Sequence, residues 1–159
     1  MTARSNGNGP RIGLDVAPAQ RPLSGVGVYV TELAAALDTL APDRMVRLGM
    51  RVDRALRSTE LRAGDSAMRG RLHLVWILRH AERDARAGGC ELVHYTNAVA
   101  PLVGTRPLVV TIHDLSVIRR PTSHPAARLA VVPFLLSAAR RARLIIVPST
   151  ATAEEVQGL

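Results

Sequence analysis

The stretch Leu108-Val109-Val110-Thr111-Ile112-His113-Asp114 decides the fold class, because a short β-branched run ends abruptly in two polar residues. A strand that is buried on both faces reads as a near-continuous apolar run, which is typical of a parallel sheet covered by helices. Ligands of open α/β sheets bind outside the carboxyl ends of the strands. We therefore expect His113 and Asp114 to lie where such a fold binds its ligand.

Similar short apolar runs alternate with helical patterns along the rest of the chain. The patterns predict strands at 11–16, 45–50, 91–95, 107–112 and 144–147, and helices at 25–41, 72–87, 125–143 (kinked at Pro133) and from Ser149 onward. The segments at 17–24, 97–106 and 114–123 are predicted to be loops. This alternation predicts an α/β domain, with a Rossmann-like, doubly wound parallel sheet over residues 11–159. Residues 1–10 are predicted to be a disordered lead, and 51–70 give no clear pattern.

Composition narrows the class of protein. Apolar residues make up 47% of the chain and aromatic residues only 3%, so the core is expected to consist of Ala, Leu and Val. A single cysteine, Cys90, excludes an intramolecular disulfide and a multi-cysteine metal site. The segment 1–10 lacks the apolar region of a signal peptide, and no apolar run approaches the about 18 residues that span a bilayer. A cytoplasmic protein is the simpler expectation.

The chain is strongly basic, with a net charge of +8, and all 21 basic residues are arginine. Two explanations of this arginine-rich composition are equally good: codon bias in a GC-rich genome, and an anionic partner of the protein. Six arginines and no acidic residue occur between 115 and 153, which fits either a solvated helix face or contact with anionic lipid or a phosphorylated substrate. Nucleic acid fits worst, because few aromatic residues are available for base stacking.

Gly25 and Gly27 lie at the start of the predicted helix 25–41, after the first strand and its loop. Backbone amides at a helix N-terminus bind anions, and glycine lets a phosphate approach the backbone. The alternative is that both glycines merely permit a turn. A G-x-G-x-x-G fingerprint is excluded because position 30 is Val30, and a P-loop is excluded because the chain has no lysine.

Polar residues at the predicted strand ends are the other candidates. A structural role of His113 competes with a role in binding or polarising a hydroxyl. A metal-binding His113–Asp114 pair would need further ligands on helices, so no metal is expected. Tyr95, Thr96 and Asn97 follow a neighbouring strand end and either cap a loop or face the same rim as His113. Ser149 suits the N-cap of the last helix.

Five segments in register resemble the N-terminal domain of a GT-B fold glycosyltransferase of glycosyltransferase family 4, of the mannosyl- or glucosyltransferase type. The resemblance covers about residues 11–158 and rests on Ile12-Gly13-Leu14-Asp15, Ser24-Gly25-Val26-Gly27-Val28-Tyr29 with Glu32-Leu33, Leu92-Val93-His94-Tyr95-Thr96-Asn97 with Pro101-Leu102, Val109-Val110-Thr111-Ile112-His113-Asp114-Leu115, and Ile145-Ile146-Val147-Pro148-Ser149-Thr150-Ala151-Thr152.

The resemblance implies roles for the candidate residues. In this family the N-terminal domain mainly holds the acceptor, and a C-terminal domain holds the nucleotide-sugar donor. Gly25 and Gly27 would face the donor diphosphate. His113, with Asp114, would be catalytic beside the transferred hexose and the acceptor. The implied activity is retaining transfer of a hexose, with no metal and no cofactor besides the nucleotide sugar.

The resemblance also implies partners. Tyr95, Asn97 and Ser149 would line the rim of a cleft for a glycan or lipid-linked acceptor, as in polysaccharide biosynthesis. Some relatives dock on membranes through a basic face, so residues 119–143 would contact an anionic membrane at its inner face. The family's donor-side signature, two glutamates separated by seven residues, does not occur. We therefore expect that the donor-binding domain is missing and that the chain alone is inactive. The alternatives are a non-catalytic α/β ligand-binding module and a nucleotide-binding oxidoreductase-type domain.

Overall fold

The computed structural model describes residues 9–20, 24–49 and 66–159. Most of the predicted lead at 1–10 and of the unpatterned stretch at 51–70 lies outside the described residues. The strands are β1 (Ile12–Asp15), β2 (Met45–Leu48), β3 (Leu92–Tyr95), β4 (Leu108–Thr111) and β5 (Leu144–Ile146). The helices are η1 (Ala17–Gln20), α1 (Gly25–Leu40), α3 (Ser66–Arg79), α4 (Ala81–Ala87), α5 (Ser116–Arg119), η2 (Pro121–Ser123), α6 (Ala126–Leu129), α7 (Val132–Arg141) and α8 (Thr150–Gln157). All five predicted strands are present.

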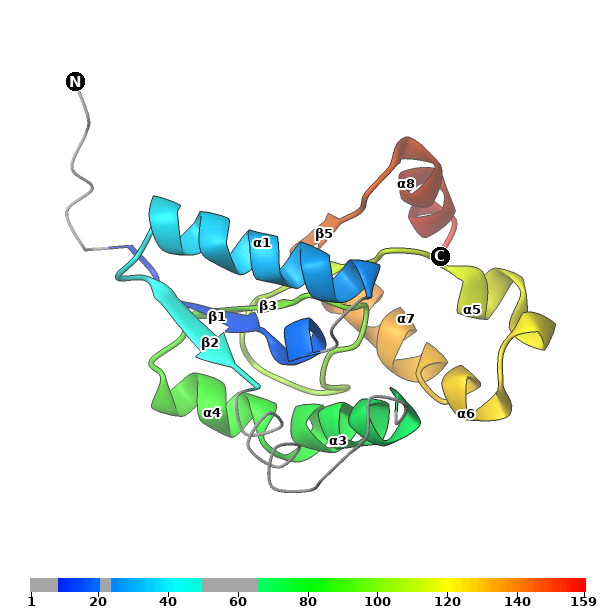
Figure 1. The fold of residues 1–159 in the computed structure, drawn as a ribbon, viewed down its shortest axis with the longest axis horizontal. Coiled ribbons are helices and arrows are strands. Elements are labelled where there is room, and N and C mark those ends of the chain that lie inside the picture. Colours follow the sequence, from blue (N-terminus) through cyan, green and yellow to red (C-terminus); the bar gives the residue numbers. More distant parts are fainter. Residues whose placement is uncertain (1–8, 21–23, 50–65) are drawn as a thin grey trace.

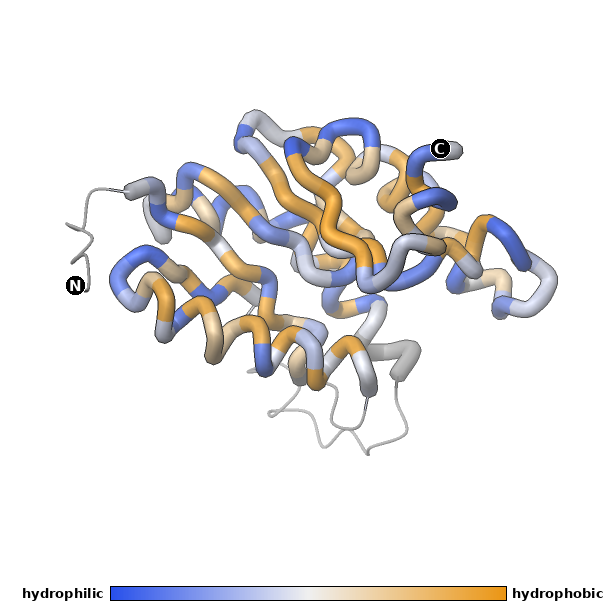
Figure 2. Tube along the Cα trace, turned by 90° about the horizontal axis from the view of Figure 1, so that it is seen from above, coloured by the Kyte–Doolittle hydropathy of each residue, from blue (hydrophilic) through white to orange (hydrophobic). Residues whose placement is uncertain are grey.

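The strands form one parallel sheet in the order β2-β1-β3-β4-β5. Helix α1 covers one face of the sheet, and α3, α4 and α7 lie on the opposite face (Figure 1). The predicted Rossmann-like, doubly wound α/β domain is therefore confirmed. Figure 2 shows hydrophobic residues concentrated along the strands at the centre of the molecule.

Two apolar clusters hold these layers together, because successive side chains of a strand point to opposite faces. Leu14 of β1 packs with Val30 of α1, on one face. Val93 and Val110 pack with Trp76 of α3 on the other. Each of these residues is at most 2% exposed, so both faces of the central strands are buried. Such burial explains why the strands read as short apolar runs rather than as alternating patterns.

The topology makes the carboxyl ends of β1 and β3 the expected ligand position of the sheet. From β1 the chain continues through α1 to β2 on one side, and then crosses to β3 on the other side of β1. The strand order therefore reverses between β1 and β3, and open α/β sheets bind ligands at such a switch point. The connection from β3 to β4 carries no helix, so the turn that follows β3 lies directly at this switch point.

The predicted helix at 72–87 is wrong as a single helix. The structure has α3 and α4 there, separated at His80, whose φ of −125° lies outside the helical range. The change of direction buries Ala81 and Ala85 completely beneath the sheet. Apolar spacing alone could not predict this break, because it arises from packing between layers.

The predicted kinked helix at 125–143 is also divided, into α6 and α7. Pro133 lies in the first turn of α7 rather than at a kink. Proline has no N–H to donate to the carbonyl of Leu129, and its fixed φ suits a helix start. The predicted loops at 17–24 and 114–123 contain the short helices η1, α5 and η2. Within the described ranges, no helix combines the length and hydropathy needed to cross a membrane.

Candidate functional site

His113 follows β4 and is half-buried at the carboxyl edge of the sheet. Its Nε2 lies 3.0 Å from the main-chain oxygen of Thr96. A carbonyl oxygen only accepts, so Nε2 carries the proton, and in the neutral ring Nδ1 is left as the acceptor. The His113 ring also meets the Tyr29 ring of α1 edge-on, with centroids 5.0 Å apart and an interplanar angle of 83°. Two elements therefore fix the orientation of this imidazole.

A buried polar group centred on Thr111 lies beneath His113. The Thr111 hydroxyl is 3.1 Å from the Tyr29 hydroxyl and 2.8 Å from Nε2 of His94. Burial lowers the pKa of His94 to about 4, although the charge of Asp15 opposes the shift. His94 is therefore uncharged near neutral pH. The polar group around Thr111 thus offers hydrogen bonds but no positive charge from this imidazole.

Asp114 is exposed and bonds to the start of α5. It accepts hydrogen bonds from the Ser116 hydroxyl and from the Ser116 amide, the latter at 2.8 Å. The Ser116 hydroxyl is the main cause that lowers the pKa of Asp114, with help from the amide and from Arg128 and His124, while partial burial opposes them. Asp114 is therefore an ionised side chain that already stabilises a helix start, and not a proton donor at neutral pH.

The two glycines in the first turn of α1 differ in how available their amides are to a ligand. Gly25 is exposed, and a Cβ placed there would meet no atom within 4 Å. Gly27 is buried, and its N–H donates to the hydroxyl of the N-cap residue Ser24 at 2.9 Å. The expected anion-facing role therefore does not fit the Gly27 amide. The amides of Gly25 and Val26 precede the first intrahelical hydrogen bond and are better placed for it.

The three predicted rim residues do not share one environment. Tyr95 is 2% exposed and belongs to the core beneath α3, α4 and α7, because strand alternation turns it away from His113. Burial raises its pKa above the ordinary value. The expectation that Tyr95 lines the rim is therefore wrong. Asn97 is half-buried in the turn after β3. Ser149 is exposed and caps α8 by accepting from the Thr152 amide at 3.2 Å.

Three buried polar residues meet near the switch point: Thr96, which was predicted at a strand end, and Asp15 and His73, which were not predicted as site residues. Asp15 is 0% exposed, and its carboxylate accepts from the Ala17 amide at 3.0 Å and from His73 Nε2 at 2.8 Å. The Thr96 hydroxyl donates to the main-chain oxygen of Asp15 at 2.8 Å. A polar residue at the end of the first strand pattern could have pointed to Asp15. Nothing near His73 in the sequence indicates that it reaches Asp15 from α3.

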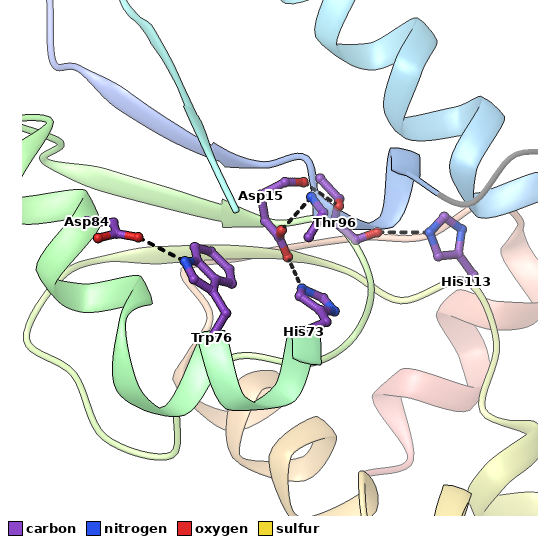
Figure 3. A network of polar contacts seen from close by, with 7 residues as sticks. Asp15, His73, Trp76, Asp84, Thr96 and His113 are labelled. Atoms are coloured by element: carbon purple, nitrogen blue, oxygen red, sulfur yellow. Dashed lines mark hydrogen bonds and ion pairs between the residues drawn. The ribbon is translucent and has the colours of Figure 1, made fainter. Parts of the chain in front are cut away.

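These contacts continue from Asp15 along α3 to α4 (Figure 3). The His73 ring stacks on Trp76, with centroids 5.9 Å apart and an interplanar angle of 12°. Trp76 Nε1 donates to Asp84 of α4 at 3.0 Å. The described part of the chain contains no group of three or more His, Cys, Asp or Glu residues arranged to hold a metal ion. The arrangement is suited to hydrogen bonding of a neutral hydroxyl-rich ligand and to binding of an anion at α1.

The model of one protein family, glycosyltransferase family 4, matches residues 23–159. The chain belongs to glycosyltransferase family 4. Searches among curated proteins and among solved structures each found no match. Membership in glycosyltransferase family 4 means that the domain is part of a sugar-transferring enzyme, with a sugar donor and an acceptor as substrates. It does not favour the oxidoreductase-type alternative.

Proposed function

We propose that this domain forms the acceptor side of a retaining family 4 glycosyltransferase. The enzyme would transfer a hexose from a nucleotide sugar to a glycan or to a lipid-linked acceptor. The observation that carries the proposal is the position of His113. Its imidazole is held by the Thr96 carbonyl and by the ring of Tyr29, which lies one helical turn after the exposed Gly25 in α1.

The chemistry proposed for this site is orientation and charge stabilisation. His113 Nδ1 would accept a hydrogen bond from a hydroxyl of the transferred sugar or of the acceptor. The N-terminus of α1, a helix of 16 residues, would stabilise the departing diphosphate through the Gly25 and Val26 amides and the helix dipole. The ionised Asp114 would favour a neutral hydroxyl over an anionic group beside it. In this scheme helix amides, without a metal ion, neutralise the diphosphate.

The first experiment tests whether His113 acts on the substrate. In an enzyme that joins this domain to a donor-binding domain, His113→Ala is expected to lower kcat by about a hundredfold, which is within the range of a lost acid–base or positioning group. The control is His80→Ala, which removes a half-buried histidine at the junction of α3 and α4. Activity of His113→Ala within about threefold of wild type, or about 0.6 kcal/mol, would show that His113 is structural.

The second experiment tests whether a separate donor-binding domain is needed. No two glutamates of the 159-residue chain are separated by seven residues, so the family's donor-side signature is not within it. We expect the chain to release no nucleoside diphosphate from UDP- or GDP-hexoses above background. Measurable turnover by these 159 residues would refute this part of the proposal.

The basic segment 119–143 supports an anionic acceptor or an anionic lipid surface at the cytoplasmic face. Five of its arginines are exposed: Arg119, Arg120, Arg128, Arg140 and Arg143. Arg141 instead donates to the main-chain oxygens of Pro101 and, at 3.2 Å, Gly104. We expect the chain to co-sediment with phosphatidylglycerol vesicles more than with phosphatidylcholine vesicles, and Arg140→Gln with Arg143→Gln to reduce the difference. Equal binding to both vesicles would remove the membrane proposal.

A further inference from the structure

The turn that follows β3 links the switch point to His113. Sheet pairing of β3 with β4 extends to Tyr95, so the next carbonyl, that of Thr96, is free of the sheet and accepts from His113 instead. We infer that Thr96 is a positioning residue for His113: its buried hydroxyl holds the peptide whose carbonyl fixes the imidazole. This inference rests on the proposed function, in which His113 meets a substrate hydroxyl.

Two bonds hold the turn, one on each side. On the β1 side, the Thr96 hydroxyl donates to the Asp15 main-chain oxygen at 2.8 Å, and Thr96 is 0% exposed. On the β4 side, the Ala98 amide donates to the main-chain oxygen of Thr111 at 2.7 Å. Ala98 has a φ of +50°, an uncommon value for a residue with a side chain. The Thr96 carbonyl is therefore directed by contacts with both neighbouring strands and not by the conformational preference of the turn.

The atom that anchors Thr96 is itself held firmly. Asp15 accepts the Ala17 amide and His73 Nε2 through its carboxylate, and both Asp15 and His73 are less than 10% exposed. The amide of the next residue, Val16, donates to the Leu48 main-chain oxygen at 3.0 Å. The peptide after β1 therefore has fixed partners on both sides. A sequence of hydrogen bonds thus runs from α3 through Asp15 and Thr96 to His113 (Figure 3).

A role of Thr96 restricted to folding makes a different prediction. If its hydroxyl only satisfied the Asp15 carbonyl, its loss would lower the stability of the whole domain and leave the His113 ring unchanged in molecules that remain folded. If Thr96 positions His113, its loss changes the state of that ring in the folded protein. The two roles can therefore be separated by spectroscopy on one imidazole.

The experiment uses the 159-residue chain with ¹⁵N-labelled histidine, and long-range ¹H–¹⁵N spectra recorded without ligand. His113 is assigned by its loss in His113→Gln. In the wild type we expect the Nε2–H tautomer of His113 to dominate and its ring to show NOEs to Tyr29. Thr96→Val should lower the ratio of Nε2–H to Nδ1–H by about threefold or more, as expected when one ordinary hydrogen bond is weakened. It should also weaken the NOEs.

Two control variants distinguish the effect of losing the Thr96 hydroxyl from a general effect of substitution on the fold. Thr96→Ser restores the hydroxyl and should restore both signals. Thr39→Val removes an exposed hydroxyl that bonds to Ala35 on α1 and should leave both unchanged. Wild-type signals in folded Thr96→Val would overturn the inference; if that variant does not fold, Thr96→Ala is judged by the same criterion. A dominant Nδ1–H tautomer in the wild type would overturn it without any variant. No sugar is involved, so this test and the turnover test with His113→Ala can fail independently.

Discussion

His94 should make the domain lose stability as the solution is acidified, and the size of the loss follows from its burial. The pKa of His94 falls from 6.5 to about 4 in the folded protein because the ring is buried. Between these values the unfolded chain binds more protons than the folded chain, so stability rises with pH and falls as pH decreases. The full shift corresponds to about 3 kcal/mol, of which about 2 kcal/mol is lost between pH 7 and pH 5.

Urea unfolding at these two pH values, followed by circular dichroism, measures this loss. Other groups titrate as well, so the wild type is compared with His94→Gln, which can still bond to Thr111 but does not titrate. The free energy of unfolding of the wild type should fall by about 2 kcal/mol more than that of the variant. The NMR titration of the His94 ring gives a direct check. Equal losses in both proteins, or a His94 midpoint near 6.5, would refute the reasoning.

Three further substitutions test the packing around the site, each by urea unfolding at neutral pH. Gly13→Ala would place a Cβ 2.6 Å from Leu48 Cδ1, a side chain only 3% exposed, so it should cost about 1–3 kcal/mol; no loss would show that the β1–β2 edge is loosely packed. Ser149→Ala removes the N-cap of α8 and should cost about 1 kcal/mol, unless α8 frays in the wild type too. Tyr29→Phe removes the bond to Thr111 and should also cost about 1 kcal/mol; an unchanged midpoint would mean that water replaces the hydroxyl.

The sequence predicted the sheet well because the central strands are buried on both faces and the strands are bounded by glycine, proline or polar residues. It predicted helix boundaries less well. The break at His80 depends on how the helices pack on the sheet, which apolar spacing does not report, whereas the break before Pro133 follows from the missing N–H of proline. His113 was found because it ends a strand. His73 was not found as a partner of Asp15, because its contact joins residues 58 positions apart and has no local signal.

The candidate site residues differ in whether the fold already uses their hydrogen-bonding groups. The Gly27 amide, the Asp114 carboxylate and the Ser149 hydroxyl each begin a helix, so substitution there changes local structure before it changes any ligand contact. His113 and Gly25 differ. One nitrogen of His113 bonds to the fold and the other is left as an acceptor, while a Cβ at Gly25 would have no described atom within 4 Å beyond its chain neighbours and the backbone of its own helix. Loss of sugar transfer in variants at these two positions would therefore report on the ligand. The same loss at Gly27, Asp114 or Ser149 could be assigned to a ligand contact only after the helix start in that variant is shown to be unchanged.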